Sequence, residues 1–129
     1  MICLISALDF HNLTLQIPHV IYVALAKNAY RPKISYPPIE YFTYPDEVLN
    51  TGTIIIKEPG WSIRIFDKEK TLIDCLIFER LLDDEIIDDA FSKYMRFPPK
   101  NYLKKLEKYA EQFGVLPQLH ERLNKSMCC

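Results

Sequence analysis

Asp67, Glu69, Lys70 and Asp74 lie close together in the sequence, so this segment is the first candidate for acid–base chemistry. Metal-dependent nucleases hold cations with convergent carboxylates, commonly beside a strand-borne acidic-x-Lys triplet. The strand that precedes this segment reads IIIKEP, which puts an isoleucine where the acidic residue before the lysine would stand. We therefore interpret the four charged residues as helix caps and solvated charge on a structural scaffold, and a nuclease as the weaker alternative.

The histidines and glycines also provide no catalytic constellation. Nucleophilic catalysis needs a Ser or Cys within reach of an oriented base, and no nucleophile-elbow sequence lies near His11, His19 or His120. A structural hydrogen bond is the favoured role for His11 and His19, and His120 is expected on an exposed helix face. Only three glycines are present, which excludes a Walker or Rossmann phosphate loop. We expect no catalytic residue, no cofactor and no metal site, and hence no enzyme.

Basic residues form two groups that are the candidate partner-binding sites. The first group lies in a proline-bounded loop and consists of Lys27, Arg31 and Lys33. The second group is spaced i, i+4, i+8 along a predicted helix and consists of Lys100, Lys104 and Lys108. An acidic block lies just upstream, at residues 83–89. Solvated helix faces and a patch that meets a charged partner are both open interpretations of this segregation.

Residues 63–82 form the stretch around which the chain is organised. Alternating apolar residues at 63–66 predict a strand, and the period then changes to that of a helix. Asp67 or Thr71 is expected to cap this helix. Its predicted inward positions, against a sheet, are Leu72, Ile73, Leu76, Ile77 and Leu81. Upstream, runs at 53–57 and 61–66 flank a Pro-Gly pair, which predicts a hairpin.

The elements on either side of this stretch follow from similar patterns. Residues 2–10 are apolar on every side of a helical wheel, which predicts a helix buried all round. Residues 19–25 predict a central strand, 39–44 a further strand and 46–49 a helical turn. After residue 82 the chain is predicted to be helical to the end. Asp83 or Asp84 is expected to cap the first of these helices, Gly114 to end the second, and Pro117 to begin a short last one.

The order of these elements predicts an α+β fold. We expect a small mixed or antiparallel sheet of three to five strands, including the hairpin at 53–66, packed against helices, with a helical C-terminal half. At 129 residues the chain is expected to be a single domain over 1–129, with a C-terminal helix and tail at 114–129.

Composition sets further bounds on the function. A hydrophobic share of 49% indicates a real core, and a net charge of −1 gives no overall attraction for nucleic acid or an anionic membrane. No apolar run is long enough to span a membrane and no signal peptide is evident, so we expect a cytoplasmic protein. The four cysteines lack zinc-ligand spacing. Cys3 and Cys75 are expected to be buried free thiols, and Cys128 and Cys129 to lie in a frayed tail.

Several pieces of the sequence together resemble AbiEi-family antitoxins, the antitoxin halves of abortive-infection toxin–antitoxin pairs, also described as transcriptional regulators of viral defence systems. The pieces are a helix at 3–8, Phe10-His11, Leu13-Thr14, residues 16–19, the strand and basic loop running to 29–32, and residues 70–75. Their order and spacing agree with the family over about residues 1–113.

The resemblance implies a role but no catalytic residues. In that family an N-terminal winged helix-turn-helix binds the operator, and the C-terminal domain is needed to counter a nucleotidyltransferase-like toxin. This chain resembles the C-terminal domain only, so DNA binding through a winged helix is not expected of it. The loss of such an upstream neighbour would also leave the first helix with an uncovered face, which predicts a homodimer.

Two functions are therefore carried forward. The first is a non-enzymatic antitoxin or regulator core of a phage-defence toxin–antitoxin system, which acts by contact with a nucleotidyltransferase-like toxin or as the non-DNA-reading half of a transcriptional regulator. The alternative is a nucleic-acid-binding or degenerate nuclease-like module that uses the lysine stripe.

Overall fold

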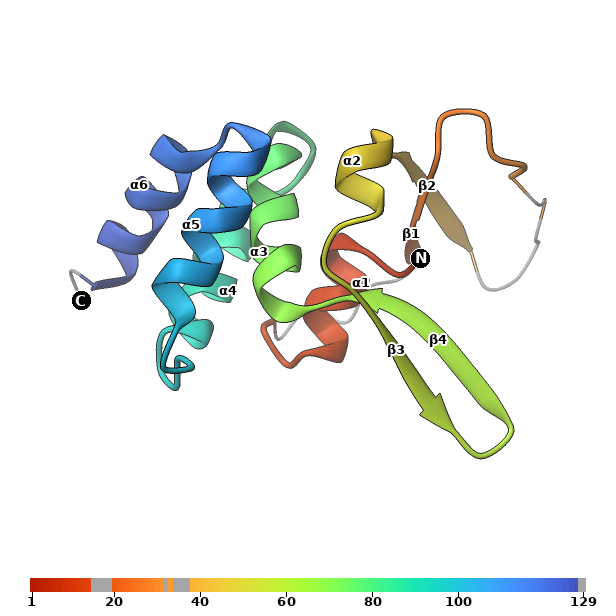
Figure 1. Ribbon diagram of the computed structural model, residues 1–129, viewed down its shortest axis with the longest axis horizontal. Coiled ribbons are helices and arrows are strands. Elements are labelled where there is room, and N and C mark those ends of the chain that lie inside the picture. The colour runs from red at the N-terminus through yellow and green to blue at the C-terminus, as the bar shows by residue number, and fades with distance from the viewer. Residues whose placement is uncertain (15–19, 32, 34–37, 128–129) are drawn as a thin grey trace.

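The computed structural model describes residues 1–14, 20–31, 33 and 38–127, and Figure 1 shows their arrangement. A β-containing half and a helical C-terminal half lie side by side along the long axis, so the expected α+β class is confirmed. The elements are, in order, α1 (Leu4–Phe10), β1 (Ile21–Leu25), β2 (Ile39–Thr43), α2 (Asp46–Leu49), β3 (Thr53–Glu58), β4 (Trp61–Phe66), α3 (Lys68–Ile77), the 3-10 turn η1 (Glu79–Leu81), α4 (Asp84–Tyr94), α5 (Tyr102–Phe113) and α6 (Leu116–Met127).

The strands form two two-stranded ladders rather than one continuous sheet. β1 pairs with β2 in parallel, and β3 pairs with β4 in antiparallel fashion. Ile2 lies between the ladders, with isolated bridges to Val23 of β1 and Ile65 of β4. The Ile2 amide donates to Arg64 O at 3.0 Å, and the Ala24 amide donates to Met1 O at 2.8 Å. The first residues of the chain therefore join the two ladders.

This pairing corrects the expected helix at 2–10. Helix α1 begins only at Leu4, because the preceding residues are extended and their backbone groups are used by the strands. The helix is also not buried all round. Leu4, Ile5, Ala7 and Leu8 are buried, whereas Phe10 is 43% exposed. Among the described residues of α1, Phe10 is the one large apolar side chain that is exposed, so little uncovered apolar surface supports the homodimer, which stays a prediction.

The hairpin at 53–66 is confirmed, with a two-residue Pro59-Gly60 connection between Glu58 and Trp61. Gly60 has φ +86°, the value that the third position of a type II turn requires. Asp67 follows directly and caps α3, its carboxylate accepting from the Lys70 amide at 2.7 Å. The chain thus passes from strand to helix with only Asp67 between them, as the sequence predicts.

Helix α3 is the central element, but its cover differs from the expectation. It packs mainly against α5, α1 and α4 rather than against a sheet, so it is enclosed by helices. Leu72, Ile73 and Leu76 are buried as predicted. Leu81 is 67% exposed, because the chain leaves the helix at Phe78 and enters η1, which turns this side chain outward.

The C-terminal helices follow the predicted caps. Asp83 caps α4 by accepting from the Glu85 amide, and Gly114 ends α5 with φ +73°. Within α5, Leu106 and Ala110 are buried, whereas Leu103 is 42% exposed. Helix α6 begins at Leu116, runs to Met127 and packs on α4 and α5, so it is longer than the short helix expected.

Candidate functional site

Lys70 and Asp74 form an ion pair in the interior, which overturns the interpretation of these residues as solvated charge. Lys70 Nζ lies 2.6 Å from Asp74 Oδ1, and neither side chain has any exposed surface. They stand one helical turn apart on α3, so a single helix positions both groups. Every residue of α3 from Glu69 to Leu76 is buried. The near-continuous apolar run TLIDCLIF that encloses Asp74 was the sequence signal of this burial.

Aromatic rings surround the Lys70 ammonium. Its Nζ lies 4.0 Å from the centroid of Phe66, with Phe113 at 5.5 Å and Tyr44 at 5.6 Å. The faces of such rings carry partial negative charge and stabilise a desolvated cation. Gly52 covers the stem of the lysine so closely that a Cβ there would lie 2.6 Å from Lys70 Cβ. This aromatic cage around Lys70 is therefore built from the segment between β2 and α2, the turn before β3, the end of β4 and α5.

Burial sets the pKa values in this cluster. It raises the pKa of Asp74 to about 7, although the ammonium of Lys70 opposes the shift. The same burial lowers the pKa of Lys70, against the attraction of Asp74. Burial also raises the pKa of Tyr44 well above its usual value and that of Cys3 to about 12. The Tyr44 hydroxyl and Asp74 Oδ2 make no hydrogen bond of good geometry with any described residue.

Two further carboxylates form an outer layer between α3, α4 and α5. Glu69 accepts from the Tyr94 hydroxyl at 2.7 Å and lies 3.0 Å from Lys105 Nζ. Asp67 accepts from the Tyr109 hydroxyl at 3.0 Å and lies 3.5 Å from the same ammonium. Burial raises the pKa of Glu69, but the bonds from Tyr94 and Lys105 outweigh it and the net pKa is lowered.

The arrangement of these groups is that of a sealed structural cluster. Lys70 and Asp74 have no solvent-accessible surface, so a substrate cannot reach them. Lys105, assigned to no site by the sequence, is tied to Asp67 and Glu69. Within the described part of the chain, no group of three or more His, Cys, Asp or Glu side chains is placed to hold a metal ion. On the hairpin, the residue two before Lys57 is the exposed Ile55, so no carboxylate stands there.

A second charge cluster uses the acidic block. Arg122 of α6 is buried and lies 2.6 Å from Asp88, 2.9 Å from Asp84 and 3.4 Å from Glu79. Sequence reasoning missed this arginine, because it lies in a helix far along the chain from its partners. Asp84 and Asp88 of the acidic block therefore pair with Arg122 within the molecule, although their side chains are 77% and 41% exposed.

The remaining chemistry-bearing residues have structural positions. His11 Nε2 lies 2.8 Å from Phe66 O, and burial lowers the pKa of this histidine. His120 is exposed as predicted, 3.4 Å from Glu107. Cys3 and Cys75 are buried free thiols, also as predicted, although Cys3 precedes α1 rather than lying in it. His19, Cys128 and Cys129 lie outside the described residues, as do residues 16–18 and Pro32.

The predicted lysine stripe is exposed. Lys104 and Lys108 lie on α5 and Lys100 just before it, and all three line a shallow depression of about 930 Å³. Glu107 and Glu111 line the same depression. The surface therefore carries both signs of charge, with the lysines and the carboxylates of one helix side by side.

The predicted basic loop is exposed too, but it is a separate surface. Lys27, Arg31 and Lys33 all face solvent, and Arg31 donates to Thr43 Oγ1 at 2.5 Å. Figure 1 places residues 26–31, which follow β1, in the β-containing half of the molecule, at the end away from α5. The two groups of predicted contact residues are thus not brought together by the fold.

Comparison with known proteins found no matching family model and no match among curated proteins. None of the described helices is long and apolar enough to cross a membrane.

Proposed function

We propose that this chain is the partner-contacting core of an antitoxin or transcriptional regulator in a phage-defence toxin–antitoxin system, and that it acts in the cytoplasm without catalysis. Its partner is a nucleotidyltransferase-like toxin. One observation carries the proposal beyond the sequence resemblance. The charged groups with unusual environments, Lys70 and Asp74, are sealed in the core, whereas the basic residues predicted to meet a partner are exposed.

The exposed basic groups provide two contact surfaces. Charged side chains at a protein surface govern on-rate and partner choice more than affinity. The surface on α5 offers Lys104 and Lys108, and the loop after β1 offers Lys27 and Lys33. Because the two surfaces lie at opposite ends of the molecule, they can be tested one at a time.

Co-expression with the cognate nucleotidyltransferase toxin tests the function. We expect the chain to restore growth to cells that produce the toxin, and the two proteins to copurify. Continued toxicity in cells that contain this chain folded at a comparable level would overturn the proposal.

Matched charge reversals then locate the contact. Lys104→Glu/Lys108→Glu and Lys27→Glu/Lys33→Glu change the net charge equally at opposite ends of the molecule. We expect the variant that touches the toxin to associate with it at least tenfold more slowly, with the other close to wild type, because rim charges act mainly on association. Growth rescue unaffected by either variant would place the toxin contact elsewhere on the surface.

Nucleic-acid binding is the second candidate, favoured by the exposed Lys104 and Lys108 on α5 and Lys100 just before it. Glu107 and Glu111 in the same depression reduce the positive potential there. Filter binding of labelled DNA and RNA at low salt, where phosphate contacts are strongest, separates the two functions. Binding that Lys104→Glu/Lys108→Glu abolishes would support the nucleic-acid function, and no binding by the wild type would remove it.

A further inference from the structure

The β3–β4 hairpin projects from the body of the molecule as an arm (Figure 1). Its base is anchored, since Ile65 and Phe66 are fully buried. Toward the tip the cover falls away, and Trp61 is 53% exposed. A hairpin without further cover is only marginally stable in water, so an exposed arm of this kind is an unusual surface for a protein to maintain.

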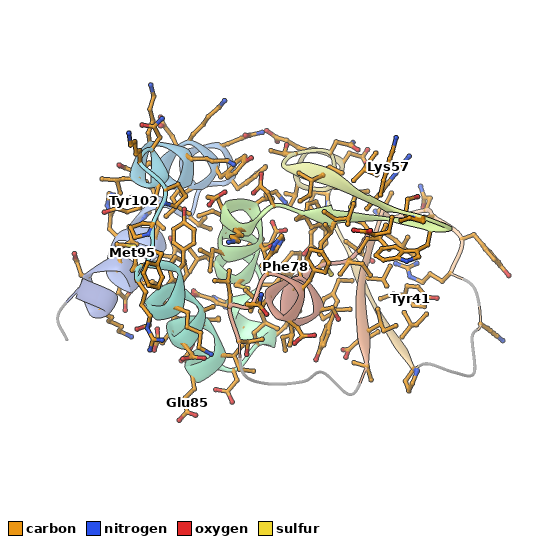
Figure 2. The ribbon with its side chains drawn as sticks, turned by 90° about the horizontal axis from the view of Figure 1, so that it is seen from below. Tyr41, Lys57, Phe78, Glu85, Met95 and Tyr102 are labelled. Atoms are coloured by element: carbon orange, nitrogen blue, oxygen red, sulfur yellow. The ribbon has the colours of Figure 1, made fainter. Side chains whose placement is uncertain are left out.

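The arm has two different faces. The strand register puts Ile54, Ile56 and Ile63 on one face, and these side chains are partly buried. The other face carries Ile55, which is 52% exposed, together with Lys57 and Arg64. Figure 2 shows Lys57 pointing away from the body, on the side of the hairpin opposite to Tyr41. The outer face is therefore apolar at its centre and positively charged around it.

Within the described part of the chain, the outer edge of β3 also presents backbone groups without a hydrogen-bond partner. Arg64 O accepts from the Ile2 amide, so the backbone of Arg64 points away from β3. Ile55 is the register partner of Arg64, and in an antiparallel ladder both members of such a pair point outward. The backbone N–H and C=O groups of Thr53 and Lys57, two residues before and after Ile55, therefore also point away from β4. No hydrogen bond joins these three outward backbone positions to another described residue.

We propose that the free edge of β3 binds an extended segment of another protein in which apolar and acidic side chains alternate. The segment adds a third strand to the hairpin through the N–H and C=O groups of Thr53, Ile55 and Lys57. Because successive side chains of a strand point to opposite faces, its carboxylates lie on the outer face with Lys57 and Arg64, and its apolar side chains lie on the other face beside Ile54 and Ile56. The inference stands on the hairpin alone and does not depend on the antitoxin function.

Charge decides between this occupant and a second copy of the chain. The outer face of the hairpin carries Lys57 and Arg64 and no carboxylate, with Ser62 and Thr53 as its other solvent-exposed members. Pairing two copies edge to edge would place four positive charges on one continuous face, and like charges on neighbouring strands are destabilising. An acidic strand instead neutralises that face.

Fluorescence anisotropy with labelled peptides tests the proposal on the full chain. The probe is a capped five-residue peptide of alternating glutamate and valine. One control has lysine in place of each glutamate. Two further control peptides keep the acidic sequence. One carries N-methyl groups on the backbone amides along one edge of the extended peptide, and the other carries them along the opposite edge. We expect the lysine peptide to bind at least tenfold more weakly, and one of the two methylated peptides to lose binding because it cannot donate to the β3 edge.

Protein variants complete the test. Lys57→Glu should weaken binding of the acidic peptide at least tenfold and strengthen binding of the lysine peptide. Ile55→Pro removes an outward amide that the β3–β4 ladder does not use, and should abolish binding of both. Lys68→Glu is the matched control, since it makes the same charge change at an exposed site on α3, and it should bind as the wild type does.

The overturning results are distinct from those of the toxin experiments. Equal binding of the acidic and lysine peptides, equal binding of all the methylated peptides, or no binding of the acidic peptide at millimolar concentration would each refute the inference. Circular dichroism checks that each variant folds. If Ile55→Pro does not fold, the methylated peptides still test whether the backbone of β3 makes the contact. A dimer in sedimentation that Ile55→Pro abolishes would assign the edge to a second copy and also overturn the proposal.

Discussion

Lys70 is the residue whose environment departs furthest from what its type leads one to expect. A lysine without exposed surface loses its hydration, and a single carboxylate at 2.6 Å together with aromatic faces replaces it. Removing one member of such a pair leaves the other charge buried and unpaired, and this destabilises a protein more than replacing both members with uncharged residues. We therefore expect the protein to tolerate the loss of both members of the pair better than the loss of one.

The first prediction is that Lys70→Met destabilises the protein by about 3 kcal/mol or more at pH 7, because it leaves the Asp74 carboxyl unpaired in the core. The double variant Lys70→Met/Asp74→Asn should recover most of that loss. Urea denaturation measures both. Lys105→Met is the control, since Lys105 is half exposed and its removal should lower the free energy of unfolding by only about 1 kcal/mol. A double variant less stable than Lys70→Met alone would contradict this account.

The second prediction concerns pH. Burial raises the pKa of Asp74 to about 7, whereas in the unfolded chain it is near 3.8. Between these values the folded state holds a proton that the unfolded state lacks. The contribution of Asp74 to the free energy of unfolding therefore falls as pH rises through this window, by at most about 1.4 kcal/mol per pH unit.

Asp74→Asn isolates this effect. His11, whose pKa is lowered by burial, acts in the opposite direction below pH 6.5, and it titrates in both proteins. The difference in the free energy of unfolding between wild type and Asp74→Asn should therefore change steadily from pH 4 to pH 7, with the wild type losing relative stability as pH rises. A pH-independent difference would show that Asp74 does not titrate in this range.

At the scale of elements, Gly52 fixes how the turn after α2 meets α3. Its φ of +73° favours glycine, and a Cβ would meet the Lys70 stem at 2.6 Å. Its carbonyl also accepts from the Asp67 amide at 2.8 Å, at the cap of α3. The close approach of these two segments thus depends on the absence of a side chain at one position.

The third prediction compares two glycines with the same φ. Gly52→Ala combines backbone strain with a steric clash, whereas Gly114→Ala, also at φ +73°, meets only open space. We expect Gly114→Ala to lower the free energy of unfolding by about 1 kcal/mol and Gly52→Ala by clearly more. Thermal denaturation followed by circular dichroism measures the difference. Equal losses would mean that the Lys70 stem moves aside without penalty.

The fourth prediction concerns the attachment of α6. Arg122 joins this helix to Asp84 and Asp88 of α4. Arg122→Gln should destabilise the protein by about 1 kcal/mol, because its charge-assisted contacts are lost, and solvent screens these contacts at the exposed Asp84 and Asp88. Hydrogen exchange of the α6 amides should become faster than that of the α3 amides. Lys104→Gln, on the open face of α5, is the control and should change stability by less than about 0.5 kcal/mol. Unchanged α6 exchange in Arg122→Gln would show that apolar packing alone holds the helix.

For the whole molecule, the important feature is that the two halves share one charged and aromatic junction. Tyr44 and Phe66 come from the β-containing half and stack at 5.6 Å, and Phe113 reaches the Lys70 cage from α5. Apolar residues on both sides belong to one buried cluster. Separation of the β-containing half from the helical half would therefore expose Lys70 to solvent.

The fifth prediction is therefore a single cooperative unfolding transition, which also tests the expected single domain. Far-ultraviolet circular dichroism reports the helices, and the near-ultraviolet signal of the buried tyrosines reports the junction. The two urea curves should coincide. Trp61 fluorescence is a useful contrast, since its exposure in the folded state should make its quenching by acrylamide nearly the same before and after unfolding. Separate transitions would mean that the halves fold independently.

The sequence by itself determined the elements and many of their ends. The Pro-Gly turn, the Asp67 and Asp83 caps and the Gly114 stop follow from local chemistry, and each is where the pattern predicts. It also predicted that the basic residues at 27–33 and 100–108 are exposed where described, since charged side chains seldom lose their hydration.

Only the tertiary structure decided that Lys70 is buried and what covers each helix. The pattern of residues 68–77 does not by itself distinguish Lys70 from the exposed Lys68, because two rings of the cage around Lys70, Tyr44 and Phe113, come from distant parts of the sequence. Nor does the local pattern show that Met1–Cys3 is extended, since its partners are strands formed later in the chain. Short-range patterns fix the conformation of a segment, whereas desolvation and strand pairing depend on groups that only the complete fold brings together.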